Sequence, residues 1–312
     1  MQTSPSPVSL GLTACLGTAA LAWALLGCGG ATSSNGNGGE GAIVLFGGGS
    51  YLADTWVWNG ASWQQQKAAG PSGRVSPAAA AINGTLVMFG GLDASQQVLG
   101  DTWLWNGNVW SQMQVTGPSA RQGAAAAAMG SSSLLFGGID GTKTPLGDTW
   151  QWNGSSWTQK TVESGPKPRT EACMAALGSK ALLFGGGYGD TWEWDGSTWT
   201  QVATTGPGAR YGAACATLNG EVVLFGGVLG STTFDDTWVW SGSSWTQATP
   251  ASAPSARALA AVATLGSTVV LFGGTNGTAE LDDTWTWDGK TWTKLSATPA
   301  PPGRNGAAIG SL

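Results

Sequence analysis

The stretch "DTWVWNGASW", residues 54–63, carries three tryptophans in ten positions and returns five more times along a chain of 312 residues. Successive copies are separated by 47, 47, 42, 46 and 47 positions. Self-similarity at a period of about 40–50 residues is typical of propellers and other repeat proteins, so this repeat decides the fold. The copies begin at Asp54, Asp101, Asp148, Asp190, Asp236 and Asp283.

Each repeat contains four short β-like runs separated by glycine or Asn-Gly turn signals. In the second copy these runs are "GRVSPAAAAI" (73–82), "TLVMFGG" (85–91), "DTWLWNG" (101–107) and "NVWSQMQ" (108–114). A four-stranded antiparallel unit of this size cannot bury both of its faces alone and must stack against its neighbours. The sequence therefore predicts an all-β, six-bladed β-propeller with four antiparallel strands per blade.

The size of the side chains changes across each unit. The first run is rich in alanine, the second contains Leu, Val and Phe, and the third and fourth carry the tryptophans. Small residues fit at the hub, where the sheets crowd together, and Trp fills the space where they splay apart. Trp56 and Trp58 share one face of an extended strand, and Trp63 follows across the Asn59-Gly60 turn. This regular placement favours packing between blades over the alternative, a row of aromatic rings that stack on carbohydrate.

The two ends of the repeat region complete one another. The first unit starts at "AIVLFGG" (42–48) without an Ala-rich run, and the chain ends on "RNGAAIGSL" (304–312), which is such a run with no unit after it. One C-terminal strand and three N-terminal strands are therefore expected to form the closing blade, which leaves no open sheet edge. The propeller domain is predicted to span residues 42–312.

Three features of the repeat resemble the kelch repeat. They are the Gly-Gly doublet after an apolar strand, as in "LLFGG" (134–138), an aromatic residue followed by Asn-Gly or Asp-Gly, and a Trp a few residues later. The resemblance covers about residues 42–312, with Trp where kelch repeats more often carry Tyr. It implies the propeller fold but no single activity, because the family includes galactose-oxidase-like copper enzymes, sialic acid mutarotases of the bacterial periplasm and many non-catalytic interaction modules.

The composition excludes several classes of function. The chain has no histidine, which rules out a His-assisted nucleophile and argues against a copper oxidase of the galactose oxidase type. With only four cysteines besides, we expect no metal site and no cofactor. A net charge of −5 and 10% charged residues give no electrostatic reason to bind nucleic acid.

Residues 1–27 have the composition of an export signal. "SLGLTACLGTAALAWALLGCGG" (9–30) holds an apolar run of secretory-signal length that is too short and too interrupted for a comfortable membrane span. Its end, "LLGC" (25–28), resembles the bacterial lipobox, which implies that Cys28 is the lipid-modified first residue of the mature chain. Residues 28–41 then form a flexible Gly/Ser/Asn tether. We expect a protein of the cell envelope, periplasmic or surface-exposed, that touches a bacterial membrane only through its lipid; ordinary secretion and an uncleaved anchoring helix are the alternatives.

Two charged residues repeat with the framework. An Arg opens each first strand and the Asp of "DTW" opens each third strand, at the same end of the blade. We expect the two to form a structural clamp across the Gly-Gly doublet, and the matched acids favour this over a ring of Arg that binds an anion in the pore. The arginines are Arg74, Arg121, Arg169, Arg210, Arg257 and Arg304.

The loops between "FGG" and "DTW" vary, with lengths of 5, 9, 9, 3, 8 and 8 residues, whereas the other turns are short and uniform. Variable loops on a rigid scaffold are where binding residues concentrate. We expect the shortest loop, "GYG" (187–189) of the fourth blade counted from Phe46, to leave a depression beside aromatic rings that suit a sugar or an extended peptide. The candidate ligand-binding residues on this face are Tyr51, Tyr188, Tyr211, Phe234, Asp93, Asp140, Lys143, Lys167 and Glu280.

Cys173 and Cys215 lie four and five residues after Arg169 and Arg210, on the innermost strands of adjacent blades. Their side chains therefore have the opposite parity that facing sheets need, although two residues pointing apart show the same parity. A disulfide between them, favoured by an oxidising exported location, is a hypothesis.

Two classes of function fit these observations. The favoured one is an exported, lipid-anchored, monomeric and non-catalytic binding module for a glycan or a protein. The alternative is a mutarotase- or hydrolase-like carbohydrate-active enzyme that uses loop carboxylates or Tyr, with a purely structural envelope role as a third reading. A glycosidase needs two carboxylates at a set separation, whereas Asp93, Asp140 and Glu280 lie in separate blades.

Overall fold

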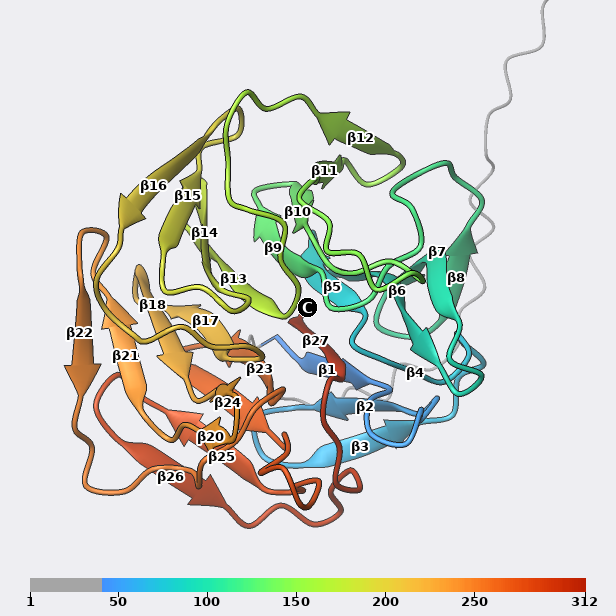
Figure 1. The fold of residues 1–312 in the computed structure, drawn as a ribbon. Coiled ribbons are helices and arrows are strands. Elements are labelled where there is room, and N and C mark those ends of the chain that lie inside the picture. Colours follow the sequence, from blue (N-terminus) through green and yellow to red (C-terminus); the bar gives the residue numbers. More distant parts are fainter. Residues whose placement is uncertain (1–40) are drawn as a thin grey trace, which may run out of the picture. The chain divides into compact units, whose positions relative to one another are not determined.

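The computed structural model describes residues 41–312 of the chain. These residues form six antiparallel sheets around a central axis, as the blades of a propeller (Figure 1). They contain no helix, and so none of the length and apolarity needed to cross a membrane. The predicted fold class is confirmed. The predicted signal, Cys28 and all but the last residue of the tether lie outside the described residues.

Blade 1 contains residues from both ends of the described chain, whereas blades 2 and 3 are continuous segments. Blade 1 consists of β27 (Ala308–Ser311), β1 (Ile43–Phe46), β2 (Thr55–Trp58) and β3 (Trp63–Gln66). Blade 2 consists of β5 (Ala78–Ile82), β6 (Thr85–Asp93), β7 (Val98–Trp105) and β8 (Trp110–Met113), with the short β4 (Arg74–Val75) also paired to β6. Blade 3 consists of β9 (Ala125–Met129), β10 (Ser132–Phe136), β11 (Thr149–Trp152) and β12 (Trp157–Lys160).

The other three blades follow in chain order. Blade 4 consists of β13 (Ala172–Leu177), β14 (Lys180–Gly185), β15 (Thr191–Trp194) and β16 (Trp199–Ala203). Blade 5 consists of β17 (Ala214–Leu218), β18 (Glu221–Phe225), β21 (Thr237–Trp240) and β22 (Trp245–Ala248), and carries the separate hairpin of β19 (Val228–Leu229) and β20 (Thr232–Thr233). Blade 6 consists of β23 (Ala261–Leu265), β24 (Thr268–Phe272), β25 (Thr284–Trp287) and β26 (Trp292–Leu295).

The second strand of each blade forms the middle of the core. All five residues of β10 are buried, because both faces of the sheet are covered by neighbouring blades. This explains why the second run of each repeat is continuously apolar, whereas first strands such as β5 alternate between buried and partly exposed residues.

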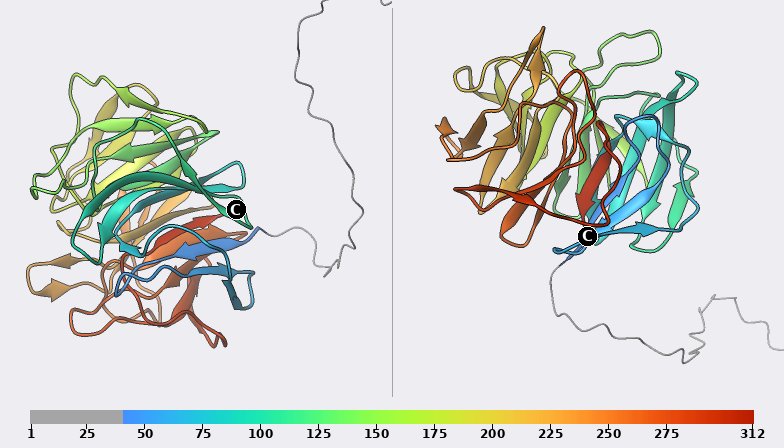
Figure 2. Two further views of the ribbon diagram at one scale, coloured as in Figure 1. Left: turned by 90° about the vertical axis from the view of Figure 1, so that its right-hand side faces the viewer. Right: turned by 90° about the horizontal axis from the view of Figure 1, so that it is seen from below.

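The closing blade joins the two ends of the described chain. β27 pairs with β1 in antiparallel register, from Ile43 opposite Ser311 to Phe46 opposite Ala308. The two strands lie side by side in both views of Figure 2. One C-terminal strand and three N-terminal strands thus complete the ring, as the sequence predicts.

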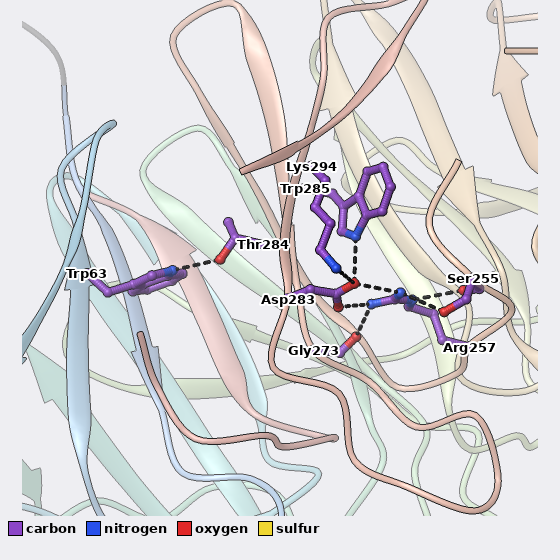
Figure 3. Close-up of polar contacts among 8 residues, drawn as sticks. All are labelled: Trp63, Ser255, Arg257, Gly273, Asp283, Thr284, Trp285 and Lys294. Carbon is purple, nitrogen blue, oxygen red and sulfur yellow. Dashed lines mark hydrogen bonds and ion pairs between the residues drawn. The ribbon is translucent and has the colours of Figure 1, made fainter. Parts of the chain in front are cut away.

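The tryptophan at the start of each fourth strand forms a hydrogen bond with the preceding blade. Trp63 Nε1 of blade 1 donates a 3.0 Å hydrogen bond to Thr284 Oγ1 of blade 6 (Figure 3). Its ring meets Phe272 edge-on at 5.3 Å and packs on Trp58 of its own blade at 5.4 Å. These rings are therefore packed between blades and are not available to stack on carbohydrate. The same bond joins Trp110 to Thr55, Trp157 to Thr102, Trp199 to Thr149, Trp245 to Thr191 and Trp292 to Thr237.

Deletion of residues 304–312 is expected to destabilise the propeller far more than its length suggests. It removes β27, exposes the edge of β1 and leaves the Asp54 carboxylate without Arg304. We expect a loss of more than about 4 kcal/mol, which is exceptional for so short a segment. Thermal melting followed by circular dichroism tests this, and equal melting temperatures for the full and truncated chains would show that the closing blade does not hold the ring.

Candidate binding face

The two ends of the propeller differ in what they carry. One end holds the loops between second and third strands together with the repeated Arg and Asp residues, and we call it the loop face. The other end, the turn face, holds short turns such as Asn83–Gly84. β1 begins at the turn face, where the Leu312 N–H donates a 2.7 Å hydrogen bond to the Ala42 carbonyl.

Four of the six loops extend as hairpins beyond the blades on the loop face. In blade 2 the pairing of β6 with β7 continues to Leu92 and Val98, and blade 5 carries the β19–β20 hairpin. In blades 3 and 6 single bridges at Ile139 and Thr275 continue the pairing. Within residues 41–312, the loops of blades 1 and 4 have no such pairing. Blades 1 and 4 lie opposite each other in the ring. The hairpins of blades 2 and 3 therefore lie on one side of the line that joins blades 1 and 4, and those of blades 5 and 6 lie on the other side.

Each repeated arginine clamps three parts of its own blade. The Arg257 guanidinium donates to both carboxylate oxygens of Asp283, at 2.6 and 3.2 Å, and to the Gly273 carbonyl at 2.9 Å (Figure 3). Its Nε donates to the Ser255 carbonyl at 2.9 Å, and Trp285 Nε1 donates to the same Asp283 carboxylate at 2.8 Å. Because each guanidinium is buried and bonded to a carboxylate, the alternative of an anion-binding Arg ring does not fit. The other pairs are Arg74–Asp101, Arg121–Asp148, Arg169–Asp190, Arg210–Asp236 and Arg304–Asp54.

The clamps shift the pKa of their aspartates downwards. Burial alone raises the pKa of Asp283, but hydrogen bonds from Arg257 and Trp285 and the attraction of Arg257 and Lys294 outweigh it and hold the pKa below its ordinary value. A carboxyl whose pKa is lower in the folded than in the unfolded chain adds stability above the unfolded pKa, and this stability is lost as the pH falls through the folded pKa. Four other clamp aspartates are shifted in the same direction, namely Asp54, Asp101, Asp148 and Asp190.

Tyr188 and Phe234 cover two of the clamps. The Arg169 Cζ lies 4.4 Å from the centroid of the Tyr188 ring, and the Arg210 Cζ lies 4.1 Å from that of Phe234. Each ring stands two residues before its clamp aspartate, so both occupy a framework position. The sequence predicts both as ligand-binding residues of the variable loops, and the structure gives each a contact with the framework. The same position is Leu52, Leu99, Leu146 and Leu281 in the other blades.

Tyr211 is the candidate aromatic residue that is exposed on the loop face. It is 37% exposed, and its backbone bridges Val228 at the start of the β19–β20 hairpin. A Cβ at Gly187 would lie 2.3 Å from the Tyr211 hydroxyl, so the glycine lets this ring lie over the short loop of blade 4. Leu229, 42% exposed, follows Val228 in β19, so blade 5 carries two exposed large apolar residues on the loop face.

Asp93 and Asp140 cap the tips of the hairpins in blades 2 and 3. The Asp140 carboxylate accepts hydrogen bonds from the N–H groups of Thr142 and Thr144, both at 2.9 Å, and Asp93 is bonded in the same way in blade 2. The hydroxyl of Ser95 also donates to Asp93 and that of Thr142 to Asp140, and together these hydrogen bonds lower the pKa of both carboxyls. Lys143 lies in the Asp140 turn with a φ of +64°. The three residues therefore shape the loops on which they lie.

The remaining candidates lie apart from one another. Tyr51 of blade 1 accepts a hydrogen bond from Gln96 at the tip of the blade 2 hairpin. Glu280 of blade 6 accepts one of 2.9 Å from Asn305 of the closing blade, and Lys167 Nζ lies 5.9 Å from the centroid of the Tyr188 ring. The candidate residues thus share the loop face but do not converge on one pocket.

A ring of six backbone hydrogen bonds closes the hub at the loop face. The residue two positions after each clamp arginine donates its N–H to the carbonyl of its counterpart in the preceding blade, at 2.7–2.9 Å. All six residues have a backbone in the left-handed region, with φ between +51° and +63°. We call them the axial ring: Ser76, Gly123, Glu171, Gly212, Leu259 and Gly306.

A cavity of about 140 Å³ lies at the axial ring, and we call it the axial mouth. It is lined by the ring and by small residues that follow it, such as Ala172 and Ala213. Glu171 is the one acidic side chain in this lining, and burial raises the pKa of its carboxyl above the ordinary value. Glu171 was not among the predicted site residues. The signal for it in the sequence is the position two residues after each Arg, which is Ser, Gly, Glu, Gly, Leu and Gly in chain order and carries an acid only here.

Below the axial mouth, Cys173 and Cys215 line the hub. Both are buried in the apolar cluster between blades 4 and 5, and both are free thiols. Burial raises the pKa of the Cys215 thiol, and a hydrogen bond with Cys173 adds to the shift. The two side chains therefore face each other, while the disulfide itself stays a prediction.

A closed ring of six four-stranded blades, each with a Gly-Gly doublet before its third strand, defines a kelch-type propeller. The chain matches the family described as the KLHDC2/KLHL20/DRC7 Kelch-repeats domain over residues 29–186 and 188–311, and it belongs to this family. A comparison with curated proteins gave no match.

Tyr188→Ala and Phe234→Ala are each expected to lower the free energy of unfolding by about 1 kcal/mol or more, because the buried guanidinium loses the ring that covers it. The matched controls are Tyr188→Leu and Phe234→Leu, which install the residue found in the other four blades and should keep most of the stability. Urea unfolding measures both pairs. Equal stability of the Ala and Leu variants would mean that the rings have no framework role.

Asp283→Asn is expected to cost about 2 kcal/mol or more at neutral pH, because Arg257 stays buried without its counter-ion. The variant should also lose less stability than the wild type as the pH is lowered below about 4, since one carboxyl with a lowered pKa is gone. Asp282→Asn, which changes the exposed neighbour, is the control and should match the wild type. Urea unfolding across this pH range that gives parallel curves for Asp283→Asn and the wild type would contradict the assignment.

Proposed function

We propose that the protein is a non-catalytic binding module whose loop face recognises a polypeptide partner. The observation that carries this is the exposure of two large apolar side chains on blade 5, Tyr211 beside the short loop of blade 4 and Leu229 in the β19–β20 hairpin, on a face with projecting hairpins. Exposed apolar side chains set among polar loops are typical of contact surfaces, and kelch propellers commonly serve as interaction modules.

Two features favour a polypeptide over a glycan. Sugar recognition needs free aromatic faces, and the rings of Tyr188 and Phe234 are each stacked on an arginine of the framework. The axial mouth, at about 140 Å³, is also smaller than the roughly 300–1,000 Å³ of pockets that enclose a ligand of drug size. A polypeptide that lies across the hairpins contacts more of this face than a ligand enclosed in the axial mouth would.

A carbohydrate-active enzyme is the second candidate, and the raised pKa of Glu171 is the observation in its favour. A glycosidase needs a second carboxylate near the first, and among the described residues that line the axial mouth Glu171 is the single acid. Asp93 and Asp140 are bonded into turns that lower their pKa, which is opposite to what a general acid requires.

We also propose that the protein is exported and held to a membrane through a lipid on Cys28, which rests on the likeness of "LLGC" to the lipobox. Metabolic labelling with an alkyne fatty acid should mark the wild type and not Cys28→Ser. Equal labelling of both would place the lipid elsewhere, and none in either would favour ordinary secretion.

Selection of peptides from a random display library on the purified full chain, beside a glycan array, tests the binding function. We expect selected peptides to lose roughly tenfold or more in affinity on Tyr211→Ala and Leu229→Ser, since exposed aromatic and apolar anchors carry much of the energy of an interface. Val109→Ser, which changes a 46% exposed apolar residue on the turn face, is the matched control and should have no effect. Specific glycan binding that depends on Tyr211, with no peptide selected, would overturn the proposal in favour of a glycan.

A further inference from the structure

Glu171 stands at the centre of the loop face, at a position where three of the six blades have glycine. In the axial ring each glycine leaves room for the side chain of the next blade: a Cβ at Gly123 would lie 3.3 Å from Glu171 Cγ, and one at Gly212 would lie 2.9 Å from Leu259. Ser76, Glu171 and Leu259 thus alternate with glycines around the axial mouth. The mouth therefore has one hydroxyl, one carboxyl and one apolar side chain on a ring that is otherwise backbone.

Two features of Glu171 are unfavourable for the stability of the fold. Its backbone is left-handed, with a φ of +53°, which glycine adopts freely and other residues adopt at a cost. Its side chain is half-buried in the axial mouth, where burial raises the pKa of the carboxyl, and within residues 41–312 no hydrogen bond or ion pair to that carboxyl is formed. The neighbouring Arg169 is committed to Asp190, at 2.8 Å. The backbone bonds of the axial ring do not require this side chain, because glycine forms them in three of the six blades, so the geometry points to a ligand.

The chemistry of the axial mouth selects a small cation on an apolar stem. The Glu171 carboxylate supplies a negative charge and the Ser76 hydroxyl a second acceptor, while Leu259, Pro77 and Ala260 supply apolar walls. A primary ammonium has three donors and is compact, whereas the guanidinium of Arg is a broad planar fork. A cavity of about 140 Å³ has room for one such side chain.

We propose that the axial mouth receives the primary ammonium group of a lysine side chain of the polypeptide partner, held by the carboxylate of Glu171. This inference rests on the proposed function, because it names the residue through which the partner enters the centre of the loop face. The hairpins then contact the chain on either side of the inserted lysine.

The direct test uses Nα-acetyl-lysine N-methylamide as the probe, titrated into the full chain and followed by the backbone amide resonances of the axial ring. We expect saturable shifts with the wild type and an affinity weaker by roughly tenfold or more with Glu171→Gln, as loss of a charged hydrogen bond produces. Asp235→Asn, which changes an exposed carboxylate on the same face, is the control and should bind as the wild type does. The Nε-acetylated probe should not bind, and glucosamine should bind more weakly, because its ammonium lacks the apolar stem.

Several results would overturn the proposal: no saturable shift with the lysine probe, equal binding of its Nε-acetylated form, equal binding by Glu171→Gln, or tighter binding of glucosamine than of lysine. Glu171→Gly distinguishes loss of the binding site from loss of the fold. It removes both the strain and the buried carboxyl, so it should abolish probe binding while raising the melting temperature by about 2 °C or more. The two proposals fail separately, since selected peptides that bind Glu171→Gln normally would end the lysine site alone, and lysine binding without any peptide partner would end the proposed function alone.

Discussion

The bidentate bond between arginine and aspartate inside each blade is the interaction on which the rest of the structure depends. It ties the start of the first strand, the Gly-Gly turn and the start of the third strand at one point, as Arg257, Gly273 and Asp283 show. Because the guanidinium is buried, an unpaired clamp is strongly unfavourable, and the geometry at this end of the blade is fixed. Loop length can then vary from 3 to 9 residues directly beside the clamp without disturbing the sheet.

The clamps hold single blades, and a second set of contacts joins the blades into a ring. Each fourth-strand tryptophan bonds a threonine of the blade before it, and the bond from Trp63 to Thr284 completes the circle. At the hub the axial ring does the same with backbone groups, where the bond from Ser76 to Gly306 joins residues far apart in the sequence. The face that carries the variable loops is therefore supported from the rim and from the axis.

The fold was predictable because the same sequence unit recurs six times. The spacing of the "DTW" stretch gave the number of blades, and the incomplete units at 42–48 and 304–312 gave the closure. The pairing of arginine with aspartate was predictable because each repeat contains one of each at the same end of the blade. In contrast, the framework contacts of Tyr188 and Phe234 were not predicted, although their position two residues before the clamp aspartate aligns them with Leu52 and Leu99. Glu171 was missed because its setting depends on a backbone ring that forms only when all six blades meet.

The central claim is that the loop face is the contact surface and the turn face is not. Hydrogen–deuterium exchange of the full chain, alone and with a selected peptide, tests this most directly, because both faces are measured in one experiment. We expect slower exchange on binding in the loop-face segments 186–189 and 226–235 and in the axial ring, with no change in the turn-face segments 106–109 and 153–156. Protection of the turn segments, with the loop-face segments unchanged, would contradict it.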